Sequence, residues 1–231
     1  MRRHTVIRRL LPFAVVLLSS SVFAAGGASP ATAPAHAAAS APAPATLSNR
    51  ASAWPSDSLH LLPVALEAST GERFTLADTA GRVRVVSMFY ASCPMVCPMT
   101  IETIRQIERA IPPPARAKFG VILATVDPER DTPKALHALA VQRHVDDRKW
   151  RLARATPSDT RALAAALGIQ YRALDNGDFN HSTVLVLLDA EGRPIARSTR
   201  IGTADPQFIE TVRKALTSSP SSSQTTSTNP P

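Results

Sequence analysis

Cysteine is scarce in this chain of 231 residues, which has only two, at positions 93 and 97. A disulfide closing so short a loop removes little chain entropy, and a domain of ordinary size has core enough to fold without one. Basic runs interleaved with aromatic residues are absent, although the net charge is +8. Residues 51–216 hold 21 Lys and Arg against 18 Asp and Glu. This balance is that of an ordinary protein surface and argues against nucleic-acid binding.

A long hydrophobic run is missing as well. Met1–Arg9 contains four arginines and no acidic residue, and the apolar stretch Leu10–Leu18 is shorter than the roughly 20 residues that span a bilayer. Small residues at positions −3 and −1 of a cut after Ala24 suit cleavage there. Residues 1–24 are therefore predicted to be a secretory signal peptide, with an uncleaved inner-membrane anchor as the alternative. No cysteine lies near the cut, which excludes lipid attachment at that point.

Two segments have the composition of disordered chain. Residues 25–53 are mostly Ala, Pro, Ser and Thr, and are predicted to be a flexible linker. Residues 217–231 are rich in Ser, Thr and Pro and are predicted to be a disordered tail. Between them, residues 54–216 are predicted to form one domain.

The domain alternates predicted strands and helices. Continuous apolar runs predict buried strands at Val83–Tyr90, Phe119–Val126 and Thr183–Leu188. Further strands are predicted at Trp150–Ala155 and Pro194–Ser198, and a small hairpin near Arg73–Leu76. Helices are predicted at Thr100–Ala110, Pro157–Leu167 and Asp205–Leu216, and another is predicted to begin at Thr132. The alternation favours an α/β, thioredoxin-like fold. We expect a central, mainly parallel sheet with helices on both faces and an antiparallel hairpin at the C-terminal end.

The two cysteines lie in Cys93-Pro94-Met95-Val96-Cys97-Pro98, where a predicted strand passes into a helix. Positions four apart are neighbours on a helix, so both sulfurs can face one side if the first turn includes residues 95–97. The free amides of a helix N-terminus lower a thiol pKa, and the thiolate is both nucleophile and metal ligand. The pattern predicts redox chemistry or metal binding. Two inert buried cysteines, or a static disulfide, are the alternative.

His181 comes directly before the predicted strand Thr183–Leu188. In a parallel sheet, ligand groups gather at one edge, beside the loops that join strands and helices. We therefore expect His181 beside the helix start that carries the cysteines. Two thiolates and one imidazole favour copper, with zinc as the commonest competitor.

A third segment, Val126–Pro133, reads VDPERDTP and is interpreted as a turn followed by a helix cap at Thr132, with charged residues 129–131 solvated or ion-paired. With FYASCPMVCP and NHSTVLVLLDAEGR, in this order and spacing, it resembles the Sco/SenC family of copper-handling proteins over residues 83–200. The resemblance implies a metallochaperone that binds copper, as Cu(I), Cu(II) or both, through Cys93, Cys97 and His181. It also implies a periplasmic role in assembling the CuA centre of cytochrome c oxidase. The implied partner is subunit II or another copper or thiol client.

Two positions depart from the family pattern. Met95 stands where an acidic residue is usual, and Asn180 where Asp is usual. A less negative site favours Cu(I) over Cu(II), because a carboxylate stabilises the ion of higher charge more. The Met95 thioether is a further Cu(I) donor in one interpretation, and a packing or partner contact in the other.

Two enzymatic functions compete with copper delivery. A thiol–disulfide oxidoreductase would use Cys93 and Cys97 as catalytic residues and would not require His181, and fold alone cannot decide between the two functions. A peroxidase of the peroxiredoxin type is third, because one reactive and one resolving cysteine could suffice. Its Pro-x-x-x-Thr-x-x-Cys arrangement does not precede Cys93.

Overall fold

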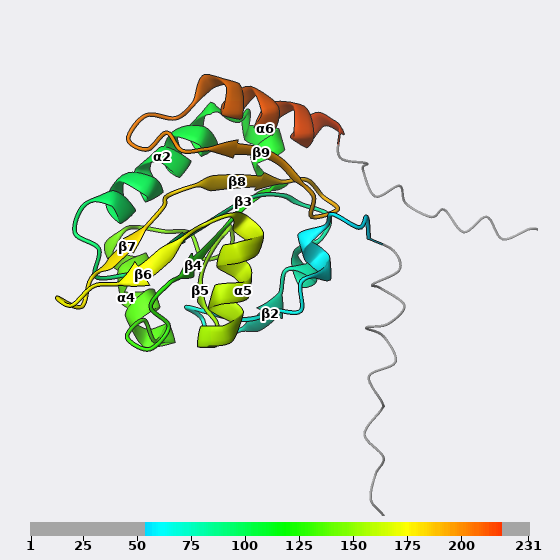
Figure 1. Ribbon diagram of the computed structural model, residues 1–231. Coiled ribbons are helices and arrows are strands. Elements are labelled where there is room, and N and C mark those ends of the chain that lie inside the picture. Colours follow the sequence, from blue (N-terminus) through cyan, green and yellow to red (C-terminus); the bar gives the residue numbers. More distant parts are fainter. Residues whose placement is uncertain (1–53, 219–231) are drawn as a thin grey trace, which may run out of the picture. The chain divides into compact units, whose positions relative to one another are not determined.

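The computed structural model describes residues 54–218 (Figure 1). The predicted signal peptide (1–24) and linker (25–53) lie outside the described residues, as does the predicted tail (217–231) except for its first two residues, which end the last helix. The strands of the main sheet are β1 (Ala65–Ala68), β2 (Arg73–Thr75), β3 (Val83–Phe89), β4 (Phe119–Thr125), β5 (Trp150–Arg154), β8 (Leu185–Leu188) and β9 (Pro194–Ser198). The helices are α2 (Val96–Ala110), α3 (Pro113–Arg116), α4 (Pro133–Gln142), α5 (Pro157–Leu167) and α6 (Pro206–Ser218), with short 3-10 turns η1 (Leu59–Leu61) and η2 (Ala77–Thr79).

The seven strands lie in the order β2-β1-β5-β4-β3-β8-β9. Strands β3, β4 and β5 are parallel, and the pairings on either side of them are antiparallel. The thioredoxin-like α/β fold and the closing hairpin β8–β9 are confirmed. The parallel part is narrower than expected, because the two hairpins β1–β2 and β8–β9 each extend the sheet in the antiparallel sense.

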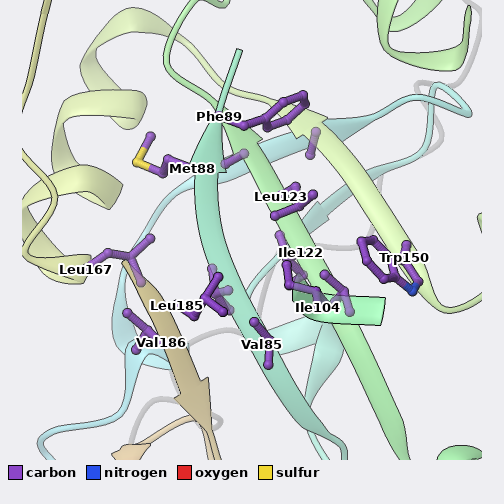
Figure 2. Packing of buried hydrophobic residues seen from close by; sticks show 14 of the residues in the cluster. Val85, Met88, Phe89, Ile104, Ile122, Leu123, Trp150, Leu167, Leu185 and Val186 are labelled. Carbon is purple, nitrogen blue, oxygen red and sulfur yellow. The ribbon is translucent and has the colours of Figure 1, made fainter. Parts of the chain in front are cut away.

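The centre of the sheet is covered on both faces. Every residue of β3 and β4 is buried, as their continuous apolar sequences predict. Helices α2, α4 and α6 lie on one face and α5 on the other (Figure 1). Two arginines join the helices of the first face: Arg105 of α2 donates to the carbonyl of Arg143, and Arg213 of α6 donates to that of Ala110 at 2.7 Å. Figure 2 shows the resulting core, in which side chains of β3, β4, β5 and β8 pack together with those of the helices.

Local sequence explains where the helices begin and end. Thr132 and Thr156 accept hydrogen bonds from the amides of Ala135 and Asp159, and a proline follows each cap. Helix α2 ends at Ala110, shortly before three consecutive prolines, two of which start the short helix α3. Within residues 54–218, no helix is both long and apolar enough to cross a membrane.

The fold brings three predicted motifs to one edge of the sheet. The cysteine segment follows the C-terminal end of β3, and VDPERDTP follows that of the parallel neighbour β4. Strand β8 runs antiparallel to β3, so its N-terminal end lies at the same edge. Just before β8, the chain forms a separate two-stranded ribbon of β6 (Tyr171–Ala173) and β7 (Phe179–His181). The sequence analysis placed His181 near this edge but did not predict the ribbon.

Candidate metal centre

The two cysteines are free thiols, not joined by a disulfide, and are buried at the start of α2. Cys93 lies in the turn that leaves β3, where its amide donates to the carbonyl of Tyr90 at 3.2 Å. Cys97 lies in the first turn of α2, and its amide donates to the Sγ of Cys93 at 3.4 Å. The structure therefore brings the two thiols together, as the helical spacing predicts. The sulfur of Cys93 takes the place of a capping oxygen for one of the free amides at the helix start.

The two thiols differ in acidity. Burial raises the pKa of Cys93, but hydrogen bonds from the Cys97 thiol, the amides of Cys97 and Met95 and the Tyr90 hydroxyl outweigh it, and the net pKa lies below the ordinary cysteine value. Burial raises the pKa of Cys97 far above that value. A backbone hydrogen bond at Tyr90 lowers this pKa only in part, and the neighbouring Cys93 and Asp131 raise it further. Cys93 is thus the thiol that ionises first.

His181 ends the ribbon strand β7 and is half-buried. Its Nδ1 lies 3.3 Å from the carbonyl oxygen of Ser182. A carbonyl oxygen only accepts, so this contact assigns the proton to Nδ1 and leaves the lone pair of Nε2 free for a metal. Burial lowers the pKa of His181, partly offset by this hydrogen bond. The imidazole is therefore neutral at pH 7, as a metal ligand must be.

Cys93 and His181 share one cavity. It measures about 300 Å³, and its lining residues come from the end of β3, the start of α2 and the ribbon: Tyr90, Cys93, Val96, Leu174, Phe179, Asn180, His181 and Thr183. Among the residues that the structure describes, no three His, Cys, Asp or Glu side chains are close enough together to hold one metal ion. The two predicted thiol ligands thus lie next to each other, and the predicted imidazole ligand lies elsewhere on the cavity that Cys93 lines. The three side chains do not form a cluster that could hold one ion.

Tyr90 connects the dithiol to the ribbon. Its hydroxyl is hydrogen-bonded to the thiol of Cys93 and lies 3.5 Å from the carbonyl oxygen of Phe179. Its ring packs edge-on against the His181 ring, with 5.9 Å between centroids. Burial, followed by the charge of Cys93, raises the pKa of Tyr90, so the phenol stays protonated and can donate. The sequence analysis did not identify this residue. Its only signal was an aromatic residue at the end of a buried strand, three positions before Cys93.

Asp131 fixes the loop that carries Cys93. One of its carboxylate oxygens accepts hydrogen bonds from the amide of Ala91, at 2.9 Å, and from the hydroxyl of Thr125. The carboxylate is buried, and burial raises its pKa despite these two donors. The sequence interpretation left this residue solvated or ion-paired. It is instead a buried acceptor that ties the VDPERDTP segment to the start of the cysteine turn.

Arg130 performs the corresponding task for the ribbon. Its guanidinium pairs with the buried carboxylate of Asp127 and donates to the carbonyl of Gly177, in the turn between β6 and β7. It also lies over the ring of Phe179, 5.7 Å from the centroid. VDPERDTP thus contacts both the cysteine turn and the histidine ribbon.

These features define a class of protein, namely a thioredoxin-like domain with a dithiol at a helix start and a histidine across the same cavity. The sequence signature of the SCO1/SenC family matches residues 62–217, and the chain belongs to this family. The protein SCO2 homolog, mitochondrial, of Danio rerio is 28% identical over 155 residues, which are 64% of this chain and 53% of that protein. A second curated relative, from Stutzerimonas stutzeri, aligns over 31% of its length. The chain thus spans about half or less of these relatives.

Solved structures share the fold. The crystal structure of Arabidopsis thaliana ScoI with copper bound has a TM-score of 0.58 at 20% identity, covering 67% of this chain and 96% of that one. The structure of BsSco, described as a member of the Sco family of cytochrome c oxidase assembly proteins with a disulfide switch, has a TM-score of 0.55 at 19% identity. It covers 66% of this chain and 91% of that one.

Proposed function

We propose that this protein is a copper metallochaperone that takes up copper through Cys93, Cys97 and His181 and passes it to a client. The observation that carries the proposal is the pair of free thiols at the start of α2, one of which, Cys93, lines a cavity that His181 also lines. Two thiolates and a neutral imidazole are soft donors that suit Cu(I). The copper-bound state of the related Arabidopsis thaliana ScoI supports the choice of metal.

In this proposal the ribbon that carries His181 moves when copper is bound. Because the three side chains are not assembled in the described residues, His181 has to approach the sulfurs when copper is bound. Its ribbon is a two-stranded sheet outside the main sheet, held at its turn by Arg130 and at the start of β7 by Tyr90. A movable ligand also suits delivery, since withdrawing one donor weakens the hold on the ion.

The relatives support a client and a location for this function. BsSco belongs to proteins that assemble cytochrome c oxidase, which supports the CuA centre on subunit II as the destination. One related solved structure is a SCO1/SenC family lipoprotein, and a curated relative is mitochondrial. Together with the predicted signal peptide, these relatives support export to the periplasm, free or held at the inner membrane.

The test is a Cu(I) competition titration of the reduced full-length protein against a chromophoric chelator. The parent protein should bind about one Cu(I) per chain, and Cys93→Ser, Cys97→Ser and His181→Ala should each weaken binding by roughly tenfold or more. His137→Ala is the matched control, because His137 lies within α4, where its Nδ1 is 4.0 Å from Asp147. Equal affinity of His181→Ala and the parent would refute the three-ligand site.

The asymmetric thiols favour a second candidate, a thiol–disulfide oxidoreductase. Cys93 has a lowered pKa and Cys97 a raised one, which is the division between an attacking and a resolving thiol. In this function Cys93 attacks a disulfide of the partner, one thiol of the partner leaves, and Cys97 then displaces the other. The partner is reduced by two electrons and the pair becomes a disulfide. Reduction of a client that persists in His181→Ala, with unchanged copper affinity, would favour this function over copper delivery.

A further inference from the structure

Sulfur occupies four alternate positions at the start of α2, at Cys93, Met95, Cys97 and Met99. The two thiols are buried, whereas Met95 is 67% exposed and Met99 is 42% exposed. The amide of Met99 donates to the carbonyl of Met95 at 3.4 Å, so the two methionines lie one turn apart. Side chains at this spacing are neighbours on one helix face. The Met95 thioether is therefore open to solvent, and that of Met99 is partly exposed one turn further along, on the helix whose first turn carries the buried dithiol.

Packing does not explain Met95 and explains Met99 only in part. Met88, the other methionine in the described part of the chain, is 1% exposed and belongs to the core. The methyl end of Met99 rests beside the backbone of Gly202, where a Cβ added to that glycine would lie 3.0 Å away. Met95 extends into solvent. An exposed methionine gains little of the burial energy that normally favours this residue.

Helix stability does not explain Met95 either. It occupies the N-cap of α2 and makes no side-chain capping hydrogen bond, whereas α4 and α5 are capped by Thr132 and Thr156. A Ser, Thr, Asp or Asn at an N-cap is worth about 1 kcal/mol over a non-capping residue. The first turn of α2 also lacks the acidic residue that its dipole would favour. Helix α2 therefore lacks both the capping hydrogen bond and the favourable charge at its N-terminus, and Met95 stands at the cap position between the two cysteines.

We infer that Met95 and Met99 form an outer thioether site for Cu(I), through which the ion passes between a partner protein and the dithiol. Neutral thioethers select a soft monovalent ion over Cu(II) or a hard cation. Two such donors leave coordination positions open for a ligand of the partner, so the ion is held only in passage. No electron is transferred, and Cu(I) exchanges one set of sulfur ligands for another. The transit role rests on the proposed copper delivery, whereas the thioether site itself does not.

The site is tested first without the dithiol. In full-length Cys93→Ser/Cys97→Ser protein carrying methyl-labelled methionine, Ag(I) replaces Cu(I) as a probe that does not oxidise. The Met95 and Met99 methyl resonances should shift together on titration, and buried Met88 should not. Met95→Leu/Met99→Leu should abolish saturable Ag(I) binding while keeping the fold. Methionine resonances that do not move, or that move no more than that of Met88, would overturn the site.

The transit role is tested with the dithiol intact. When Cu(I) is supplied by a chelator complex and followed by stopped flow, Met95→Leu/Met99→Leu should load severalfold more slowly and reach the same final affinity as the parent. Unchanged loading would overturn the transit role. A parent protein that fails to bind Cu(I) at all would refute the proposed function, and the methyl shifts in the cysteine-free variant would still decide on the outer site.

Discussion

The guanidinium of Arg130 donates a hydrogen bond to the main-chain carbonyl of Gly177, 47 residues further along the chain. The contact joins the loop after β4 to the turn of the ribbon that ends in His181. The adjacent Asp131 accepts a hydrogen bond from the amide of Ala91, at the start of the turn that carries Cys93. Two consecutive side chains thus set the positions of the segments that carry the cysteines and the histidine.

Arg130→Gln should loosen the ribbon without changing the dithiol. The guanidinium is half exposed, so its contribution is screened, and we expect a loss of about 1 kcal/mol, or roughly fivefold in Cu(I) affinity. Hydrogen exchange of residues 171–181 should quicken, and that of residues 93–99 should not. Arg148→Gln is the control, because Arg148 forms an exposed pair with Asp146.

A double-mutant cycle separates positioning from general damage. If Arg130 acts through His181, then Arg130→Gln should cost no further Cu(I) affinity in the His181→Ala background. Additive losses would show that Arg130 supports the fold and not the imidazole.

Asp131→Asn should change how stability depends on pH. The pKa of this carboxyl is raised in the folded protein, chiefly by burial, so the folded state holds its proton to higher pH than the unfolded state does. The parent therefore loses stability as pH rises from the ordinary carboxyl pKa through the raised one. Asparagine retains an acceptor oxygen and has no charge to bury. The free energy of unfolding of the variant, relative to the parent, should rise over this window.

Chemical denaturation at several pH values between about 4 and 7 measures this difference. Groups other than Asp131 cancel, since they titrate in both proteins. Asp131→Ala is the companion variant. It leaves the amide of Ala91 and the hydroxyl of Thr125 unpaired and should lose about 1–3 kcal/mol at every pH. If the free energy of unfolding of Asp131→Asn, relative to the parent, fell as the pH rose, burial would not be what raises the pKa of this carboxyl.

Alkylation should distinguish the two thiols. Iodoacetamide reacts with thiolates, so at neutral pH it should label Cys93, whose pKa is lowered, and leave Cys97, whose pKa burial raises. Tyr90→Phe removes a hydrogen bond that favours the Cys93 thiolate, and the midpoint of the pH–rate profile should move upward. Tyr171→Phe is the matched control at the other tyrosine. Peptide mass mapping gives the site of label, and faster labelling of Cys97 would reverse the assignment.

Local patterns predicted most of the fold. The apolar sequences of β3 and β4 indicated strands buried on both faces, the Thr132 cap marked the start of α4, and α5 was predicted to begin at Pro157, as it does. The position of His181 before β8 was enough to place it at the edge that carries the cysteines. These predictions are correct because apolar periodicity and helix capping depend on residues that are close in the sequence.

The ribbon was missed because each of its strands is only three residues long and contains no buried residue, and three residues are too few for an alternation of apolar and polar side chains to indicate a strand. Its one signal is Asn176-Gly177, a dipeptide typical of hairpin turns, where Gly177 has φ = 83°. The contacts of Arg130 and Asp131 span about 40 residues or more. Such contacts depend on how the strands are arranged in the sheet, and they cannot be predicted from the residues on either side of position 130 or 131.

Met95→Asp should raise stability and lower the reduction potential of the copper-loaded protein. An aspartate at this N-cap can accept a hydrogen bond that Met95 cannot, and its charge suits the helix dipole, which together are worth about 1 kcal/mol. The same charge beside the metal stabilises Cu(II) more than Cu(I), because the interaction grows with the charge of the ion. Denaturation and spectroelectrochemical titration measure the two effects.

Met95→Ser separates charge from capping, since serine caps the helix, lacks the thioether and adds no charge. Both variants should therefore gain stability, and only Met95→Asp should show the additional fall in potential. Raising the ionic strength should reduce the difference in potential between them, because position 95 is open to solvent and its charge is screened. Equal potentials in the two variants at low salt would place residue 95 too far from the bound ion for its charge to act. The outer site would then have to hold Cu(I) away from the dithiol, on the solvent side of the turn.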